Sequence, residues 1–271
     1  MKCLKIISVL IGILSLHSCE KVIDFDLADS EKAIVIEAIL ASGKSPFTVT
    51  ISKTTPYFET NAGDPVSGAK VSLRTENGTP RYCKETSAGT YSLERSTKPT
   101  NTWYIVDVVY NGITYTAKSY LNDPVPISDL SFSYFDGLGV LDSGYKVHCY
   151  IHDPQDKENY YRIKYYVNGK IADDDGEITL YSDELFNGKE IGLGQRSKTF
   201  GLTDTLTIEL QSIDKAAYDY FSTLENITSE DWLQSASPAN PISNFNNGAL
   251  GYFSAYSFDR KKVVIKDFIK E

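Results

Sequence analysis

Residues 103–120, WYIVDVVYNGITYTAKSY, carry the strongest fold signal in the chain. β-Branched and aromatic residues, which favour strands, lie on both sides of Asn111-Gly112. Asn-Gly accepts the positive φ angles that a two-residue primed turn requires. The stretch therefore predicts two antiparallel strands joined by a tight hairpin.

The first half of the chain contains further strand signals around this hairpin. PFTVTIS at residues 46–52 and AKVSLR at residues 69–74 alternate between apolar and polar side chains, the pattern of strands that bury one face. Turn signals recur between such segments, as at Ser42-Gly43, Asn77-Gly78 and Ala88-Gly89. Residues 22–121 are therefore predicted to form an antiparallel β-sandwich of roughly seven strands, immunoglobulin-like or transthyretin-like.

The second half is also rich in strand signals. NDPVPISD, with Pro124 and Pro126, predicts a stiff connector between two domains. The strand-like segments that follow it are SGYKVHCYIHD, NYYRIKYYVNGK, DTLTIELQS, GYFSAYSF and KKVVIKD. Only IDKAAYDYFSTLE has apolar residues at helical spacing, with Asp214 as a candidate N-cap. Residues 122–271 are predicted to form a second, mostly β domain with one helix.

The N-terminus has the pattern of a secretory signal peptide. Residues 6–16 form an apolar run preceded by Lys2 and Lys5, and no acid precedes Glu20. A membrane-spanning helix needs about 20 apolar residues, roughly twice the length of this run. Residues 1–18 are therefore predicted to be a leader that is removed.

Leu16-His17-Ser18-Cys19 looks like a lipobox, the site at which bacterial lipoproteins are acylated on cysteine and then cleaved. Two or more acyl chains, such as palmitate, on Cys19 would anchor the mature chain stably. The alternating VIDFDL segment follows at once, so residues 19–21 are the predicted tether. Its two residues after Cys19 reach about 7 Å.

Charge and cysteine content restrict the partners. Removing residues 1–18 leaves 25 Lys and Arg against 36 Asp and Glu, a net charge of −11. Such a surface repels nucleic acids and anionic lipids, so the lipid is expected to provide membrane attachment. Cys83 and Cys149 lie on separate predicted strands and are expected to be free thiols rather than a disulfide.

The chemistry-bearing motifs do not predict an enzyme. His148 and His152 are about 13 Å apart on an extended strand, too far to share one zinc ion. Ser67 and Lys70 have the spacing of a nucleophile pair but precede a strand rather than lying on one helical turn. Residues 173–177, DDDGE, are expected to be a solvated hairpin tip rather than a calcium loop. No catalytic residue, metal ligand or cofactor is predicted.

Two kinds of segment are candidates for recognition. Tyr160, Tyr161 and the stretch from Asn244 to Tyr256 could supply aromatic platforms for peptides or sugars, or could fill a β-core. The polar, proline-broken loop at residues 238–248 is either structural wrapping or a contact surface. The candidate contact residues are Pro241, Asn244, Asn246, Asn247, Gly248, Tyr252 and Phe253.

The chain resembles a family of Bacteroidota outer-membrane lipoproteins catalogued as a domain of unknown function (DUF4249). The segments that carry the resemblance are CEKVIDFDL, AIVIEAIL, PVSGAKVSL with GTYSLE after it, IHDPQDKENYYRI and PANPISNFNNGALGYFSAYS. They are spread over nearly the whole mature chain. The last is the most distinctive.

Family members are commonly encoded beside TonB-dependent outer-membrane receptors. The resemblance therefore implies a non-enzymatic accessory or ligand-binding lipoprotein of the outer membrane, on its periplasmic or its cell-surface side, with a TonB-dependent receptor as partner. It supplies no catalytic residues. The alternatives are a cell-surface adhesion or structural interaction protein and an extracellular hydrolase.

Overall fold

The structure is a computed structural model that describes residues 32–55, 63–94, 98–139, 142–172, 178–195, 198–228 and 240–269. The leader, Cys19, the tether at residues 19–21 and the VIDFDL segment lie outside the described residues. Contacts divide the chain into Met1–Lys32 and Ala33–Glu271, and every named strand belongs to the second unit. The predicted mainly β fold is confirmed.

The hairpin predicted from residues 103–120 is present. Strands β7 (Thr102–Tyr110) and β8 (Ile113–Leu121) pair antiparallel in continuous register. Asn111 and Gly112 have φ angles of 49° and 78°, as a primed turn requires. Strands β3 (Lys70–Thr75) and β4 (Arg81–Tyr82) extend the hairpin to a four-stranded sheet in the order β4-β3-β7-β8.

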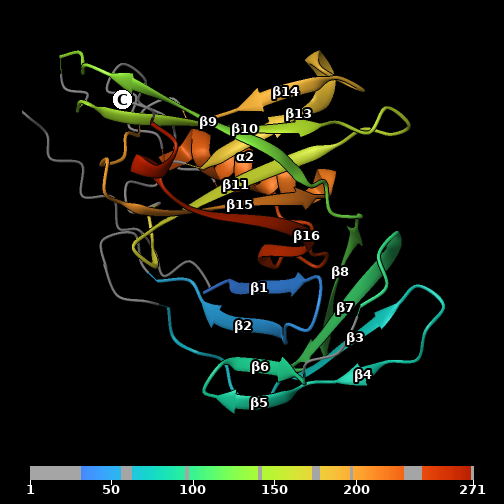
Figure 1. The fold of residues 1–271 in the computed structure, drawn as a ribbon. Coiled ribbons are helices and arrows are strands. Elements are labelled where there is room, and N and C mark those ends of the chain that lie inside the picture. Colours follow the sequence, from blue (N-terminus) through green and yellow to red (C-terminus); the bar gives the residue numbers. More distant parts are fainter. Residues whose placement is uncertain are drawn as a thin grey trace, which may run out of the picture. The chain divides into compact units, whose positions relative to one another are not determined.

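A second, longer sheet contains strands from both halves of the chain. Its order is β12-β11-β15-β16-β1-β2-β6-β5, with β13 also paired to β11. The strands are β1 (Ile34–Ala41), β2 (Phe47–Lys53), β5 (Lys84–Ser87), β6 (Thr90–Leu93), β11 (Tyr160–Val167), β12 (Lys170–Ile171), β13 (Thr179–Ser182), β15 (Thr205–Ile213) and β16 (Leu250–Val264). In Figure 1, β16 runs between β15 and β1.

The pairing of β1 with β16 differs from all others in the described parts of the chain because it is parallel. The first part of β16 pairs with β1, and the remainder, Ser257–Val264, pairs antiparallel with β15. Gly251 sits opposite Ile36 with a φ of 93°. A Cβ atom there would lie 2.1 Å from the Ile36 carbonyl oxygen, so the close approach of the two strands requires glycine.

A third sheet, in the order β14-β10-β9, contains β9 (Ile127–Phe135), β10 (Gly144–His152) and β14 (Glu190–Leu193). Two short 3-10 helices, η1 (Asp183–Leu185) and η2 (Ile265–Asp267), complete this region. β9 is an edge strand in this order, and strand edges offer unpaired backbone groups.

Two hydrophobic cores lie between the sheets. The first core joins the long sheet to the four-stranded sheet through side chains such as Ile36, Phe47, Val106 and Phe253. The predicted buried faces of residues 46–52 and 69–74 belong to it. The second core joins the long sheet to the three-stranded sheet and is built by Val125, Ile127, Val147, Cys149, Ile151, Tyr161, Ile163, Tyr165, Leu206, Ile208, Leu210 and Ile265, among others. Each fully buried aliphatic or aromatic side chain stabilises the fold by roughly 1.5–3 kcal/mol.

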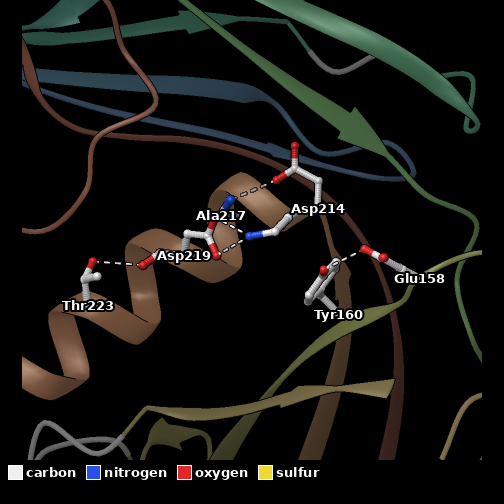
Figure 2. A network of polar contacts seen from close by, with 7 residues as sticks. Glu158, Tyr160, Asp214, Ala217, Asp219 and Thr223 are labelled. Atoms are coloured by element: carbon white, nitrogen blue, oxygen red, sulfur yellow. Dashed lines mark hydrogen bonds and ion pairs between the residues drawn. The ribbon is translucent and has the colours of Figure 1, made fainter. Parts of the chain in front are cut away.

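The predicted helix is confirmed as α2 (Lys215–Thr228). Asp214 caps it, because its Oδ1 accepts a hydrogen bond of 2.9 Å from the Ala217 N–H (Figure 2). Asp214 Oδ2 accepts a second one from the Tyr120 N–H at the end of β8. Burial raises the pKa of Asp214 above its ordinary value. No helix in the described ranges is long and apolar enough to cross a membrane.

The predicted connector is fixed against the long sheet. The Asn122 side chain donates to the Ile213 carbonyl (3.1 Å), the Val125 N–H to Ser212 Oγ (3.3 Å) and the Ile127 N–H to Asp259 Oδ2 (2.8 Å). Residues on both sides of the predicted boundary at 121/122 share one sheet through β1 and β16. The division into two domains stays a prediction.

Cys83 and Cys149 are free thiols, as predicted. Cys149 is fully buried in the second core, whereas Cys83 is half-buried beside the first. Burial raises the pKa of each thiol to about 12. Both are therefore protonated near neutral pH.

Candidate functional site

The predicted contact loop is held to its own protein by asparagine side chains. Asn244 pairs with the Phe253 backbone through two hydrogen bonds of 2.8 Å, as donor to the carbonyl and as acceptor from the N–H. Asn246 also makes two hydrogen bonds to one residue, Thr116 of β8: its backbone N–H donates to the Thr116 carbonyl (3.0 Å) and its side-chain Oδ1 accepts from the Thr116 N–H (2.7 Å). The loop thus covers part of the β8 edge.

The remaining candidate contact residues have different environments. Asn247 donates from Nδ2 to the Thr114 carbonyl (2.8 Å) and forms a turn with Gly248, both at positive φ. Pro241 is half-buried, and Phe253 is fully buried in the first core, where no partner can touch it. Tyr252 points to α2. The structure therefore does not gather these residues into one contact surface.

The two tyrosine-rich segments instead converge around α2. Tyr252 of β16 contacts Tyr220 and Phe221, with ring centroids 4.6 and 4.9 Å apart. Tyr160 of β11 contacts Tyr218 at 5.0 Å and donates a hydrogen bond of 3.0 Å to Glu158 (Figure 2). Such aromatic pairs are stabilising beyond the area they bury. This cluster places α2 across one end of the outer side of the long sheet.

A small hollow of about 40 Å³ adjoins the cluster. We call its lining the α2 face. The face consists of Ile39, Arg162, Lys164, Gln211, Phe221, Tyr252, Ser254 and Tyr256. They come from β1, β11, β15, β16 and α2, so distant segments build the face together.

Cationic and aromatic groups are stacked at this face. The guanidinium carbon of Arg162 lies 4.0 Å from the centre of the Phe221 ring, a cation–π contact. Burial, with a smaller effect of the nearby carboxylate of Glu209, raises the pKa of Tyr256 to about 12. The Tyr256 phenol is therefore neutral near pH 7 and can donate a hydrogen bond.

Beneath the face lies a buried acid flanked by cations. Glu209 is 1% exposed and opposes Lys164 on β11 and Arg260 on β16. It accepts hydrogen bonds from Gln211 and Arg260. Arg162 lies one pair further along β11, opposite Gln211. Charged side chains of both signs therefore lie at this face, in a chain that carries a net charge of −9.

Ser254 supplies a buried hydroxyl to the α2 face. Its side chain is 2% exposed, and its Oγ has no hydrogen-bond partner in the structure. A buried hydroxyl without a partner destabilises a fold by about 1–3 kcal/mol. Because Ser254 lines the hollow, a ligand oxygen or nitrogen placed there would satisfy it. The arrangement suits binding of a small group that accepts hydrogen bonds.

The other motifs singled out in the sequence do not assemble. His148 and His152 lie along β10, and His152 is exposed with Nε2 3.9 Å from a Glu190 oxygen. No group of three or more metal-ligating side chains occurs among the residues that the structure describes. Ser67 precedes β3, at whose first position Lys70 lies, as expected for a turn entering a strand. Residues 173–177 fall outside the described ranges.

Sequence reasoning missed the polar members of the α2 face. Arg162, Gln211 and Ser254 occupy alternate positions of amphipathic strands, where polar residues ordinarily face solvent. The aromatic residues gave a partial signal through their density between residues 244 and 256. Only the tertiary structure brings the two sets together.

Fold and site define a mainly β protein with an aromatic, cationic hollow on the outer side of its long sheet. The sequence matches the family model described as Domain of unknown function (DUF4249) over residues 20–262, and the chain belongs to this family. No curated protein matches the sequence.

Two chicken structures of fibronectin type III domains share limited similarity with the chain. The crystal structure of CNTN1 FN1–FN3 domains is 15% identical with a TM-score of 0.24, over 65% of this chain and 59% of that chain. The two-domain fibronectin type III segment of tenascin is 13% identical with a TM-score of 0.22, over 67% and 91%. This chain therefore spans less than two thirds of the CNTN1 fragment.

Proposed function

We propose that the chain is a non-enzymatic, lipid-anchored accessory module of the outer membrane that binds a ligand on the α2 face and works with a TonB-dependent receptor. One observation carries the binding role: aromatic rings, cations and the unpartnered Ser254 hydroxyl meet in one hollow. Ligand sites typically combine an apolar lining with a few convergent polar groups, and a hollow of about 40 Å³ would hold one small group of such a ligand. The lipobox and the family resemblance support the location.

Acylation of Cys19 is tested by labelling growing cells with a palmitate analogue. The wild-type chain and a Cys83→Ala control are expected to carry the label and to sediment with membranes. Cys19→Ala is expected to lose both, because the thioether is the only covalent lipid link proposed. Equal labelling of Cys19→Ala would remove the proposed anchor.

The proposed partnership with a TonB-dependent receptor is tested by co-purification. The full chain, tagged at its C-terminus, is extracted from membranes in mild detergent and its partners are identified by mass spectrometry. A TonB-dependent receptor encoded beside the gene is expected in stoichiometric amount. Its consistent absence, with the lipid anchor intact, would count against the transport role.

The edge strand β9 favours a second candidate function, adhesion or assembly through strand pairing. In the described sheet β14-β10-β9 this nine-residue strand lies at the edge, and Tyr134 on it is 58% exposed. Exposed edges can pair with strands of other chains. Higher oligomers in native extracts that lack the receptor would support this alternative.

A further inference from the structure

A second cavity, separate from the α2 face, opens at one end of the first core. Its volume is about 260 Å³. It lies between the long sheet, which contributes Phe47 and Leu93, and the four-stranded sheet, which contributes Leu73 and Tyr104. We call it the end pocket. Its floor is continuous with the first core and is apolar.

Positive charges line the same pocket. Lys98 is only 8% exposed, and its ammonium donates hydrogen bonds to the carbonyl oxygens of Gly43 (3.3 Å) and Ser45 (2.5 Å). Burial lowers the pKa of Lys98, and the positive charge of Arg81 lowers it further. The two cations therefore repel each other across the pocket, and an anion between them would relieve that repulsion.

The remaining charges at the pocket are partly compensated. Arg74 Nε lies 3.4 Å from an oxygen of Asp107. Glu94 is the acidic side chain in the described lining, and it is 89% exposed with an oxygen 4.0 Å from the Lys84 ammonium. Arg81, on the two-residue strand β4, is exposed at the pocket.

We infer that the end pocket binds a small organic carboxylate, with the carboxylate between Arg81 and Lys98 and an apolar body on the floor formed by Leu73, Leu93 and Tyr104. Arginine recognises carboxylates through paired N–H donors. A bare inorganic anion would leave the apolar floor in contact with water. The floor therefore favours a carboxylate that carries an apolar body. The inference does not depend on the α2 face.

The test uses the full chain in detergent and benzoate as the probe, with binding followed by calorimetric titration. Benzoate is expected to bind at least ten-fold more tightly than benzyl alcohol, which lacks the charge, and than acetate, which lacks the ring. Inorganic phosphate is expected to bind more weakly than benzoate. Phosphate or acetate binding as tightly as benzoate would overturn the role of the floor.

Arg81→Gln is the decisive variant because Arg81 is exposed, whereas Lys98 also holds the Gly43–Ser45 turn and its loss could unfold the chain. Arg81→Gln is expected to weaken benzoate binding at least five-fold. Lys266→Gln, an exposed charge change in η2, should leave it unchanged. Absence of benzoate binding to the wild type, or equal affinity in Arg81→Gln, would overturn the inference.

Discussion

The first and second cores pack against the same long sheet, whose outer side is covered by α2 in one region and exposed in another. Over β11, β15 and the part of β16 that pairs with β1, α2 and its aromatic partners cover the outer side and create the α2 face. Further along the sheet, on β1 and β2, the outer side carries exposed polar residues such as Glu37 and Thr50. The helix, rather than the sheet, therefore turns one region into a candidate binding surface.

The two regions also depend on a common element. β16 supplies Phe253 and Ala255 to the first core, and its later part pairs with β15 over the second. The pairing of β1 with β16 at Gly251 is therefore expected to stabilise both cores. Four changes of decreasing expected effect test how far the regions are coupled.

The largest effect is expected from Gly251→Ala. The new Cβ would lie 2.1 Å from the Ile36 carbonyl oxygen, so β1 and β16 must separate. We expect a loss of more than about 4 kcal/mol in the free energy of unfolding, measured by urea denaturation. Gly248→Ala is the matched control: its φ is also positive, but the Cβ meets open space, so it should cost about 1 kcal/mol. Equal losses would show that the close strand approach is unimportant.

Asp214→Ala tests the link between α2 and the end of β8. It removes the acceptor for the N–H groups of both Ala217 and Tyr120, so we expect a loss of about 2–3 kcal/mol. Asp219→Ala, which breaks only the exposed pair with Lys215, should cost about 0.5 kcal/mol or less. Comparable effects of the two substitutions would argue against a special role of the cap.

Asn246→Ala tests the loop that covers β8. Loss of the bond from the Thr116 N–H is expected to destabilise the protein by about 1 kcal/mol and to speed amide hydrogen exchange at Thr116. Asn240→Ala, at an exposed position of the same loop, should change neither quantity. Unchanged exchange at Thr116 in Asn246→Ala would mean that the loop does not protect the edge.

A smaller, pH-dependent effect is expected at Asp214. Burial raises its folded-state pKa above the ordinary value of 3.8, so the folded state holds this proton more tightly than the unfolded state. The resulting stabilisation is complete below 3.8 and is lost as pH rises through the folded-state pKa. The stability of the wild type relative to Asp214→Asn should therefore fall as pH increases across this window. A constant difference would contradict the raised pKa.

The sequence predicted the local parts of this fold well. The 103–120 hairpin, the buried face at 46–52 and the helix after Asp214 each carry a signal within one short segment. The parallel pairing of Val35 with Leu250 has no such signal, because no turn joins the strands and many partners would satisfy the same alternation. The α2 face is harder still to predict from sequence. Whether the Ser254 hydroxyl has a hydrogen-bond partner depends on residues that are distant in sequence and meet only in the folded protein.

Ligand binding at the proposed α2 face can be measured by native mass spectrometry of the full chain purified from its own membranes. We expect the wild type and Lys266→Gln to retain a small-molecule adduct, and Arg162→Gln and Lys164→Gln, shown to be folded, to lose it. An adduct that persists in both face variants, or no adduct on any form under any growth condition, would contradict the claim.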